Sequence, residues 1–283
     1  MVELQPSKLV MRVRFPSPAL IVCRRGPREA LLSVREDIQK NSERYIGWLT
    51  EACSIPSLPE QPDGLVQMAS WLESRFEELG ADRERLPYPG APDALLATLG
   101  SGERSVLIYD HYDVQPVDPI ELWDSKPFEP EIRDGVFFAR GAADNKGDFD
   151  ARLAALDVYR RVYGELPVLV KFLVEGEEET GSRSFPAIVE RYGDKIKADG
   201  CIWEGTGIDH ADRPELVFGA KGLAYVELTY RGLADDQHSS LAVVAPSPVW
   251  HLIEALSSMR SPDGKVLIEG FYDDVIQPDA TDE

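Results

Sequence analysis

The sequence predicts an α/β protein built around a mixed, partly parallel sheet. Short apolar runs such as SVLIY and VLVKFLV alternate along the chain with longer amphipathic stretches, as expected for strands alternating with helices. The 283 residues are 43% hydrophobic and 28% charged, which is the composition of a globular protein with a core of its own. Polar residues also follow directly after several apolar runs, where partly parallel sheets place functional side chains.

Periodicity assigns the elements of the first half in order. A helical pattern begins near residue 33 and ends at the proline-rich segment CSIPSLPEQPDG, because proline interrupts a helix. A second helix, LVQMASWLESRFEELG, stops at Gly80, since glycine favours helix C-termini. The apolar runs ALLATL and SVLIY then predict two strands.

The second half repeats this alternation and then changes in character. DFDARLAALDVYRRVYG predicts an amphipathic helix that ends at Gly164 and leads into the buried strand VLVKFLV. SFPAIVERYG predicts another helix, and DGCIWE predicts a further strand. Later, ELVFGAKGLAYVELTYRG indicates a strand-like pair and SPVWHLIEALSSM a helix. We therefore expect a main domain over 33–213 and a second domain over 214–283.

The N-terminal segment differs from the rest of the chain. Residues 1–32 are rich in Lys and Arg, although the whole chain is acidic. The apolar piece ALIVC is too short for the hydrophobic region of a signal peptide. We interpret residues 1–32 as a disordered or non-native extension, such as a misplaced start codon would add, in preference to a targeting peptide.

Charge and cysteine content exclude several classes of function. The net charge of −20 argues against nucleic acid or an anionic membrane as a partner. The chain contains no apolar run near the roughly 18 residues that a membrane span needs. Its cysteines, Cys23, Cys53 and Cys201, are widely spaced, which predicts neither a disulfide framework nor a cysteine zinc site. Reduced thiols in a cytoplasmic protein are the expectation.

Residues capable of metal chemistry follow four of the predicted strands and turns. They occur in the segments SVLIYDHYDVQP, FFARGAADNKGD, LVEGEEETGS and DGCIWEGTG. The candidates are His111, Asp113, Asp144, Glu178, Glu179 and Glu204. Each alone has an ordinary explanation as a hydrogen-bonded histidine, a helix N-cap or a solvated acidic face. Together, imidazole and carboxylates at one sheet edge form the ligand set of zinc, manganese or cobalt.

Three segments also carry a family resemblance. In order, YDHYDVQP, ARGAADNKGD and EGEEETGS resemble signatures of the dinuclear zinc metallopeptidase and amidohydrolase family. That family includes carnosine dipeptidase, cytosolic non-specific dipeptidase, aminoacylase, glutamate carboxypeptidase and succinyl-diaminopimelate desuccinylase. The resemblance covers residues 40–283 and favours the dipeptidase branch. It implies a zinc-exopeptidase-like catalytic domain over 33–213 and the start of an inserted α+β lid or dimerisation domain over 214–283.

The resemblance assigns metal ligands by position. His111 and Glu204 would bind one metal, Glu179 would bind a second, and Asp144 would bridge the two. Asp113 would orient the imidazole of His111, as metal-bound histidines usually require. A complete site would hold two zinc ions, with manganese or cobalt as alternatives.

Two further catalytic roles follow from the same resemblance. Glu178 would be the general base that takes a proton from the attacking water and passes it to the leaving amine. His238, in DDQHSS, matches a lid histidine that stabilises the oxyanion across a dimer interface in relatives. The alternative for His238 is an ordinary loop histidine near a turn. Glu175 and Glu177 are expected to be structural or solvent-facing.

The chain departs from the family pattern at two places. Asp110 stands where relatives usually have glycine, and an extra carboxylate there would tune metal affinity or crowd the backbone. Relatives also take the last ligand of the second metal from a downstream histidine, whereas no histidine follows His251 here. We therefore expect a truncated family member that binds one metal better than two and has little or no activity.

The predicted function is metal-dependent hydrolysis of the amide bond in dipeptides or similar small substrates, with a homodimer as the full-length form. One alternative is an N-acyl-amino-acid deacylase or desuccinylase that uses the same site. The other is a non-catalytic remnant whose acidic strand ends bind a metal structurally or bind nothing.

Overall fold

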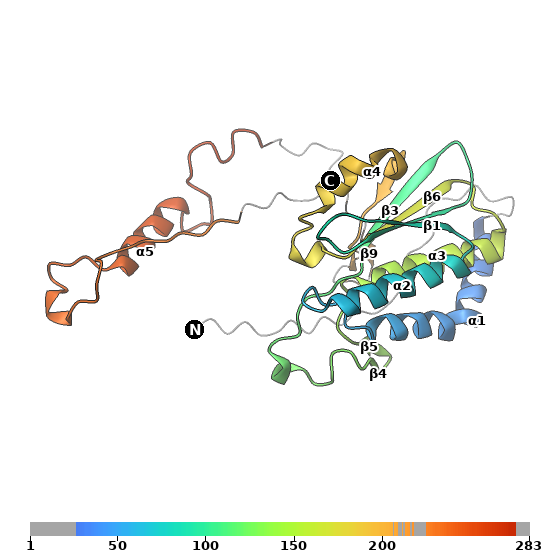
Figure 1. Cartoon of the computed structure of the whole chain (residues 1–283), viewed down its shortest axis with the longest axis horizontal. Helices are drawn as coiled ribbons and strands as arrows, with labels where there is room; N and C mark the ends of the chain where they lie inside the picture. Colours follow the sequence, from blue (N-terminus) through green and yellow to red (C-terminus); the bar gives the residue numbers. More distant parts are fainter. Residues whose placement is uncertain are drawn as a thin grey trace. The chain divides into compact units, whose positions relative to one another are not determined.

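The computed structural model divides the chain into two compact units, Met1–Leu216 and Val217–Glu283, each described by itself (Figure 1). The residues that it describes are 27–205, 207, 208, 211, 213–215, 217 and 225–275.

A five-stranded mixed sheet forms the centre of the first unit, with the strand order β1-β2-β6-β3-β7. The strands are β1 (Asp82–Leu86), β2 (Ala94–Leu99), β6 (Leu169–Glu175), β3 (Ser105–His111) and β7 (Gly200–Ile202). β2 is antiparallel to both β1 and β6, whereas β3 is parallel to both β6 and β7. The three parallel strands therefore end at the same edge, where His111 lies opposite Glu175. The predicted mixed α/β fold is confirmed.

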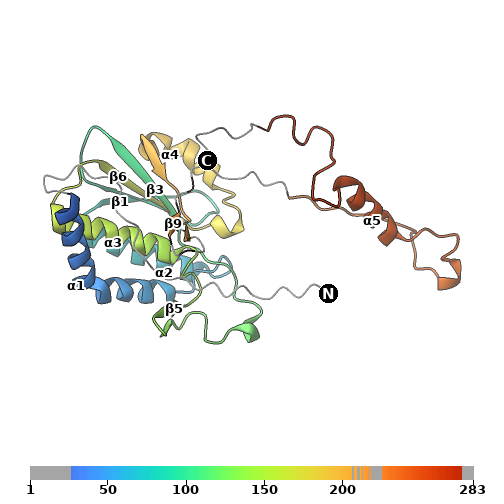
Figure 2. The ribbon, with the colours of Figure 1, turned by 180° about the vertical axis from the view of Figure 1, so that it is seen from behind.

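Helices cover both faces of this sheet (Figures 1 and 2). α2 (Pro62–Glu78) and α3 (Lys146–Tyr163) lie on one face, and α1 (Pro27–Cys53) packs against α3 on the side away from the sheet. α4 (Phe185–Ile196) lies on the opposite face. The sheet therefore lies between α2 and α3 on one face and α4 on the other.

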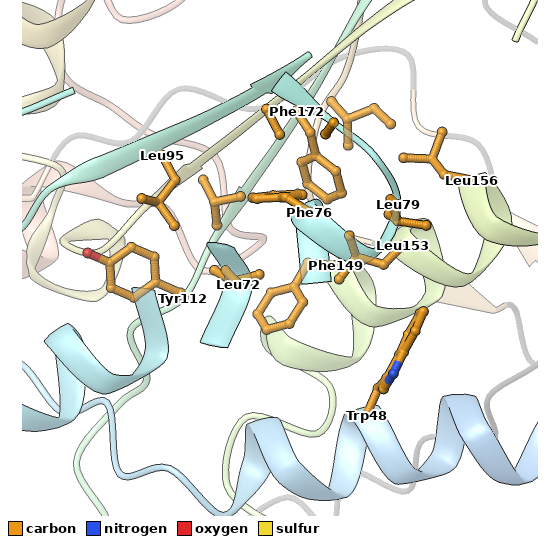
Figure 3. Packing of buried hydrophobic residues seen from close by; sticks show 14 of the residues in the cluster. Trp48, Leu72, Phe76, Leu79, Leu95, Tyr112, Phe149, Leu153, Leu156 and Phe172 are labelled. Carbon is orange, nitrogen blue, oxygen red and sulfur yellow. The ribbon is translucent and has the colours of Figure 1, made fainter. Parts of the chain in front are cut away.

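The larger hydrophobic core lies between the sheet and helices α1 to α3 (Figure 3). Phe76 of α2 meets Phe172 of β6 edge to face, with ring centroids 5.4 Å apart. Phe149 and Leu153 extend this core along α3, and Trp48 of α1 closes it on the far side of α3. Each fully buried side chain of this size contributes roughly 1.5–3 kcal/mol, so the core fixes α3 firmly beneath the sheet.

A smaller core attaches α4 to the other face of the sheet. Ile188 and Ile196 are buried there against Tyr109 and Leu173, with Phe185 and Tyr192 partly buried beside them. These apolar α4 residues recur at intervals of three and four, as one face of an amphipathic helix requires.

The remaining elements are short. β4 (Glu131–Arg133) and β5 (Val136–Phe138) form a hairpin, and β8 (Gly207–Ile208) pairs with β9 (Pro214–Glu215). The 3-10 helices are η1 (Ile120–Leu122), η2 (Glu178–Thr180) and η3 (Ser239–Leu241). The second unit also contains α5 (Pro248–Met259) and a bridge between Arg260 and Val266. No helix in the described part of the chain is long and apolar enough to cross a membrane.

Two details differ from the sequence-based expectation. α1 begins at Pro27, earlier than the helix start expected near residue 33; proline is favoured in the first turn of a helix. Residues 225–230, expected in a strand-like pair, form no strand, because a strand needs a hydrogen-bonded neighbour. Leu216 and residues 218–224 of that predicted pair lie outside the described residues.

Candidate metal centre

The predicted ligands come from four separate segments at one edge of the sheet. His111 is the last residue of β3, and Asp144 lies in the turn before α3. Glu178 and Glu179 begin η2, just beyond β6, and Glu204 follows β7. Because β3, β6 and β7 run parallel, their C-terminal ends bring these segments together.

The imidazole of His111 is the centre of this group. Its Nε2 lies 2.9 Å from Asp144 Oδ1, 3.3 Å from Glu204 Oε2 and 4.0 Å from Glu178 Oε2. The His111 side chain is only 1% exposed, whereas that of Asp144 is 69% exposed. The group is therefore buried on the histidine side and open on the Asp144 side.

Several carboxylates thus lie close to one imidazole, and this proximity shifts the pKa values of these groups. Burial and the neighbouring carboxylates, Glu178 foremost, raise the pKa of Glu204 to about 7, against the opposing effect of His111. Burial lowers the pKa of His111, but hydrogen bonds to Asp113 and Asp144 outweigh this effect and raise the pKa to about 11. A cation placed among these oxygens would relieve their mutual repulsion.

A second pair of carboxylates extends the group. One ligand atom each from His111, Asp144 and Glu179 lies within 4.8 Å of the other two. Burial raises the pKa values of both Glu178 and Glu179, and the charge of Asp144 adds to the effect. An imidazole and clustered carboxylate oxygens are the donors that a divalent transition metal prefers, so these residues fit such an ion.

Asp113 connects the histidine to the glutamate turn. His111 Nδ1 lies 3.1 Å from the Asp113 carbonyl oxygen and 3.3 Å from its Oδ1. The buried Asp113 carboxylate also accepts the backbone N–H groups of Glu178 and Glu179, at 3.2 and 3.0 Å. A single side chain thus orients the imidazole and fixes both glutamates.

Lys146 holds the Asp144 turn against the end of α1. Its Nζ is fully buried and donates to the carbonyl oxygens of Ala52 and Ile55, at 2.9 and 2.6 Å. Burial lowers the pKa of Lys146 to about 8. The proline-broken segment after α1 therefore helps to place a predicted metal ligand.

The sequence of this chain matches a known protein family. Residues 107–269 match the model of "Peptidase family M20/M25/M40", and this range includes every residue predicted for the site. The chain belongs to this family. The resemblance noted in the sequence is confirmed, and M20 metallopeptidases imply a divalent metal.

Individual proteins that are similar in sequence to this chain also have peptidase names, consistent with the M20/M25/M40 family. Cys-Gly metallodipeptidase dug1 of Schizosaccharomyces pombe is 30% identical over 272 residues, covering 88% of this chain and 56% of the relative. Human Beta-Ala-His dipeptidase is 29% identical over 300 residues, covering 95% of this chain and 56% of the relative. This chain therefore spans about half the length of the curated relatives it matches.

A solved structure supports the fold assignment. The M20 family metallo-carboxypeptidase Sso-CP2 from Sulfolobus solfataricus matches with a TM-score of 0.71 and 37% sequence identity. The match covers 84% of this chain and 54% of that structure. The zinc-exopeptidase-like architecture expected from the resemblance therefore agrees with a solved M20 structure.

The other two glutamates in the EGEEETGS segment of this M20/M25/M40 chain make structural contacts. Glu175 is buried at the end of β6 and accepts the hydroxyl groups of Tyr109 and Ser182, at 2.5 and 2.8 Å. Glu177 accepts the backbone N–H of Ser184 at 3.0 Å. These contacts stabilise the turn after β6, in line with the structural role expected for both residues.

Gln115 was missed by sequence reasoning. Its Nε2 donates to Glu179 Oε2 at 2.7 Å and to the Glu179 carbonyl oxygen at 3.3 Å. The only sequence signal was its place in HYDVQP, one of the segments that favoured the dipeptidase branch.

The predicted lid histidine belongs to the second unit. His238 caps η3, where its Nδ1 accepts the backbone N–H of Ser240 at 3.2 Å. His251 stacks on Tyr230 with ring centroids 4.7 Å apart, and His210 lies outside the described residues. The oxyanion role of His238 stays a prediction.

Proposed function

We propose that this chain forms the metal-binding part of an M20-type hydrolase site that cleaves the amide bond of dipeptides. The observation that carries the proposal is the convergence of Asp144, Glu204 and Glu178 within 4.0 Å of His111 Nε2. The names of the relatives, Cys-Gly metallodipeptidase and Beta-Ala-His dipeptidase, support a dipeptide substrate.

Zinc is the metal we propose, with manganese or cobalt as alternatives. His111, Asp144 and Glu204 would hold one ion, and Asp144 and Glu179 would contribute to a second. A divalent metal bound there polarises the scissile carbonyl and lowers the pKa of water. Asp113 supports a ligand of each proposed metal ion, because its carboxylate lies 3.3 Å from His111 Nδ1 and accepts the Glu179 N–H.

Glu178 is the proposed general base. Its backbone is fixed by Asp113, and its Oε2 lies 4.0 Å from His111 Nε2. Burial raises the pKa of Glu178, which makes its carboxylate a better proton acceptor. The carboxylate would take a proton from the attacking water and then donate it to the amine nitrogen as the C–N bond breaks.

We also propose a homodimer and a cytoplasmic location. α5 in the second unit exposes apolar side chains such as Trp250, Ile253 and Leu256, which a partner subunit would cover. The wide spacing of Cys23, Cys53 and Cys201 predicts no disulfide framework, which supports a reducing compartment.

A second candidate is removal of the C-terminal residue from longer peptides. The name of the solved relative, a metallo-carboxypeptidase 37% identical to this chain, favours it. Both reactions break an amide bond beside a free carboxylate, so the same groups around His111 would serve either one. A substrate panel distinguishes them.

Metal binding is the first test, because this chain spans about half the length of its curated relatives. The purified chain would be dialysed against trace zinc and its metal content measured by elemental analysis. We expect zinc to be bound by the wild type and by His251→Ala but lost in His111→Ala. Zinc retained by His111→Ala would contradict the proposed site.

Hydrolysis is then measured on Cys-Gly, β-Ala-His, a tripeptide and an N-acetyl amino acid. We expect hydrolysis of the dipeptides by this chain to be weak and to require metal. In Glu178→Gln, hydrolysis should fall by about 10²–10⁴ while zinc content is unchanged. Loss of zinc in Glu178→Gln would instead make Glu178 a ligand.

A further inference from the structure

One face of α3 contacts three successive residues that follow β7. Asn145, which caps α3, donates from Nδ2 to Glu204 Oε2 at 3.0 Å. Asp148 Oδ2 accepts the backbone N–H of Gly205 at 3.1 Å, and Arg152 Nη2 donates to the Trp203 carbonyl oxygen at 2.7 Å. Positions 145, 148 and 152 are spaced by three and four residues, so they share one helix face.

These contacts matter because the sheet does not hold Glu204. β7 is the outermost strand among the described residues, and its residues Gly200 to Ile202 are exposed. Its register with β3 ends at the pair Ile108 and Ile202, two residues before Glu204. Beyond that pair, the α3 side chains anchor the backbone on both sides of the carboxylate.

Arg152 also anchors the strand that ends in His111. Its side chain is only 11% exposed, and its Nη1 donates to the Tyr109 carbonyl oxygen at 3.0 Å. The same Nη1 forms an ion pair with the carboxylate of Asp110, which is fully buried directly before His111. The guanidinium therefore connects the end of β3 to the segment that carries Glu204.

The ring of Trp203 strengthens this connection. It stacks on Tyr109 with centroids 3.9 Å apart and an interplanar angle of 24°. Trp203 is thus attached to β3 through its ring and to Arg152 through its carbonyl oxygen. Glu204 follows immediately, so these contacts place its backbone near His111 while β7 is paired with β3.

We propose that Arg152, held by Asp110, is a positioning residue that sets the Glu204 carboxylate relative to His111 for metal binding. This inference rests on the metal site of the proposed function. It assigns a purpose to the buried Asp110, whose carboxylate pairs with Arg152 at the strand end. A planar guanidinium suits the task because it offers several fixed N–H donors to acceptors on two strands.

The test measures zinc affinity of the full chain by competition with a chromogenic chelator. We expect Arg152→Met to weaken zinc binding by about 10–100-fold, as loss of a group that supports a ligand does. Arg152→Lys keeps the charge beside Asp110 and therefore the fold. A compact ammonium cannot hold Asp110, Tyr109 and Trp203 together, so this variant should also lose about tenfold.

A matched control acts on the opposite end of the same strand. Asp199 precedes β7, and its Oδ2 accepts the N–H and the hydroxyl of Ser105, at 2.6 and 2.9 Å. Asp199→Asn should lower the melting temperature in chelator yet leave zinc affinity within about twofold of wild type. A purely structural role for Arg152 would make zinc affinity follow the melting temperature in all variants.

The outcomes separate this inference from the proposed function. Wild-type zinc affinity in both Arg152→Met and Arg152→Lys would overturn the positioning role and leave the metal site intact. Absence of zinc binding by the wild type would overturn the metal site, and the inference with it. Weaker binding in both variants, with Asp199→Asn unchanged, supports the inference.

Discussion

The buried carboxylate of Asp113 accepts the backbone N–H of Glu179 at 3.0 Å. This hydrogen bond joins the segment after β3 to the turn after β6, which are far apart in the sequence. The other carboxylate oxygen accepts the N–H of Glu178 at 3.2 Å, so both oxygens are used. The relative position of the histidine and the two glutamates therefore depends on an aspartate side chain with two acceptor oxygens.

We predict that Asp113→Asn weakens zinc binding by about 10–100-fold. Asparagine has one acceptor oxygen, so one of the two amides would face an NH₂ group, at a cost of about 1–3 kcal/mol in stability. Chelator competition measures the affinity, and thermal unfolding measures the stability. Asp157→Asn is the control, because Asp157 accepts the Tyr45 hydroxyl and is outside the predicted ligand set. Unchanged zinc affinity in Asp113→Asn would disprove the orienting role.

Loss of the Gln115 side chain should weaken the binding of a second metal ion more than the binding of the first. Its Nε2 donates to Glu179 Oε2 at 2.7 Å, whereas among the described residues it makes no hydrogen bond to Glu204 or His111. We expect Gln115→Leu to weaken the second zinc equivalent by about tenfold and the first by less than twofold. Calorimetric titration of the metal-free chain resolves the two events. Equal weakening of both would mean that Gln115 supports the whole turn.

Gly176 is predicted to be intolerant of any side chain. A Cβ atom there would lie 2.3 Å from Cζ and 2.5 Å from the hydroxyl oxygen of the buried Tyr112. Overpacking of this kind costs about 1–3 kcal/mol, so Gly176→Ala should lower the melting temperature. Gly193→Ala, within α4, has no atom within 4 Å of the added Cβ. That control should gain roughly 0.5–1 kcal/mol. A stable Gly176→Ala would show that Tyr112 can move.

The ion pair between Glu73 and Arg85 should make stability depend on pH in the acid range. Arg85 binds Glu73 through two hydrogen bonds, at 2.9 and 2.6 Å, and these lower the pKa of Glu73. A lowered pKa in the folded state stabilises the fold above the unfolded pKa of about 4.3. That stabilisation is lost as the pH falls through the folded pKa.

We therefore expect Glu73→Gln to cost about 0.5–1 kcal/mol at pH 7 and almost nothing at pH 3. Chemical unfolding at both pH values measures the difference from wild type. The exposed residue Glu60 provides a control, and Glu60→Gln should change stability at neither pH. A deficit in Glu73→Gln that persists at pH 3 would rule out the ion pair as its cause.

The elements with strong apolar signals could be predicted from the sequence. The runs ALLATL, SVLIY and VLVKFLV became the inner strands β2, β3 and β6, because burial on both faces requires continuous apolar side chains. β1, with the sequence DRERL, was missed because an edge strand needs few apolar residues. The hairpin of β4 and β5 was also missed, although its Asp134-Gly135 turn is a known hairpin signal.

The sequence could predict only those site residues whose place at the sheet edge follows from the order of strands and turns. His111, Asp144, Glu178 and Glu204 meet because parallel strands finish at one edge, and the sequence already showed that order. The supporting contacts could not be predicted in the same way. Arg152 reaches Trp203 across 51 positions, and nothing in the local pattern of either segment indicates the pairing.

The outermost position of β7 has a consequence for amide hydrogen exchange. An edge strand of three residues can detach from β3 without opening the core, so the Cys201 and Ile202 amides should exchange early. If zinc joins Glu204 to His111, detachment must first release the metal. Zinc at 100 times its dissociation constant would then add about 2.7 kcal/mol to that opening and slow exchange of these amides roughly 100-fold. Metal occupancy and fraying of this strand would thus be linked as a single equilibrium.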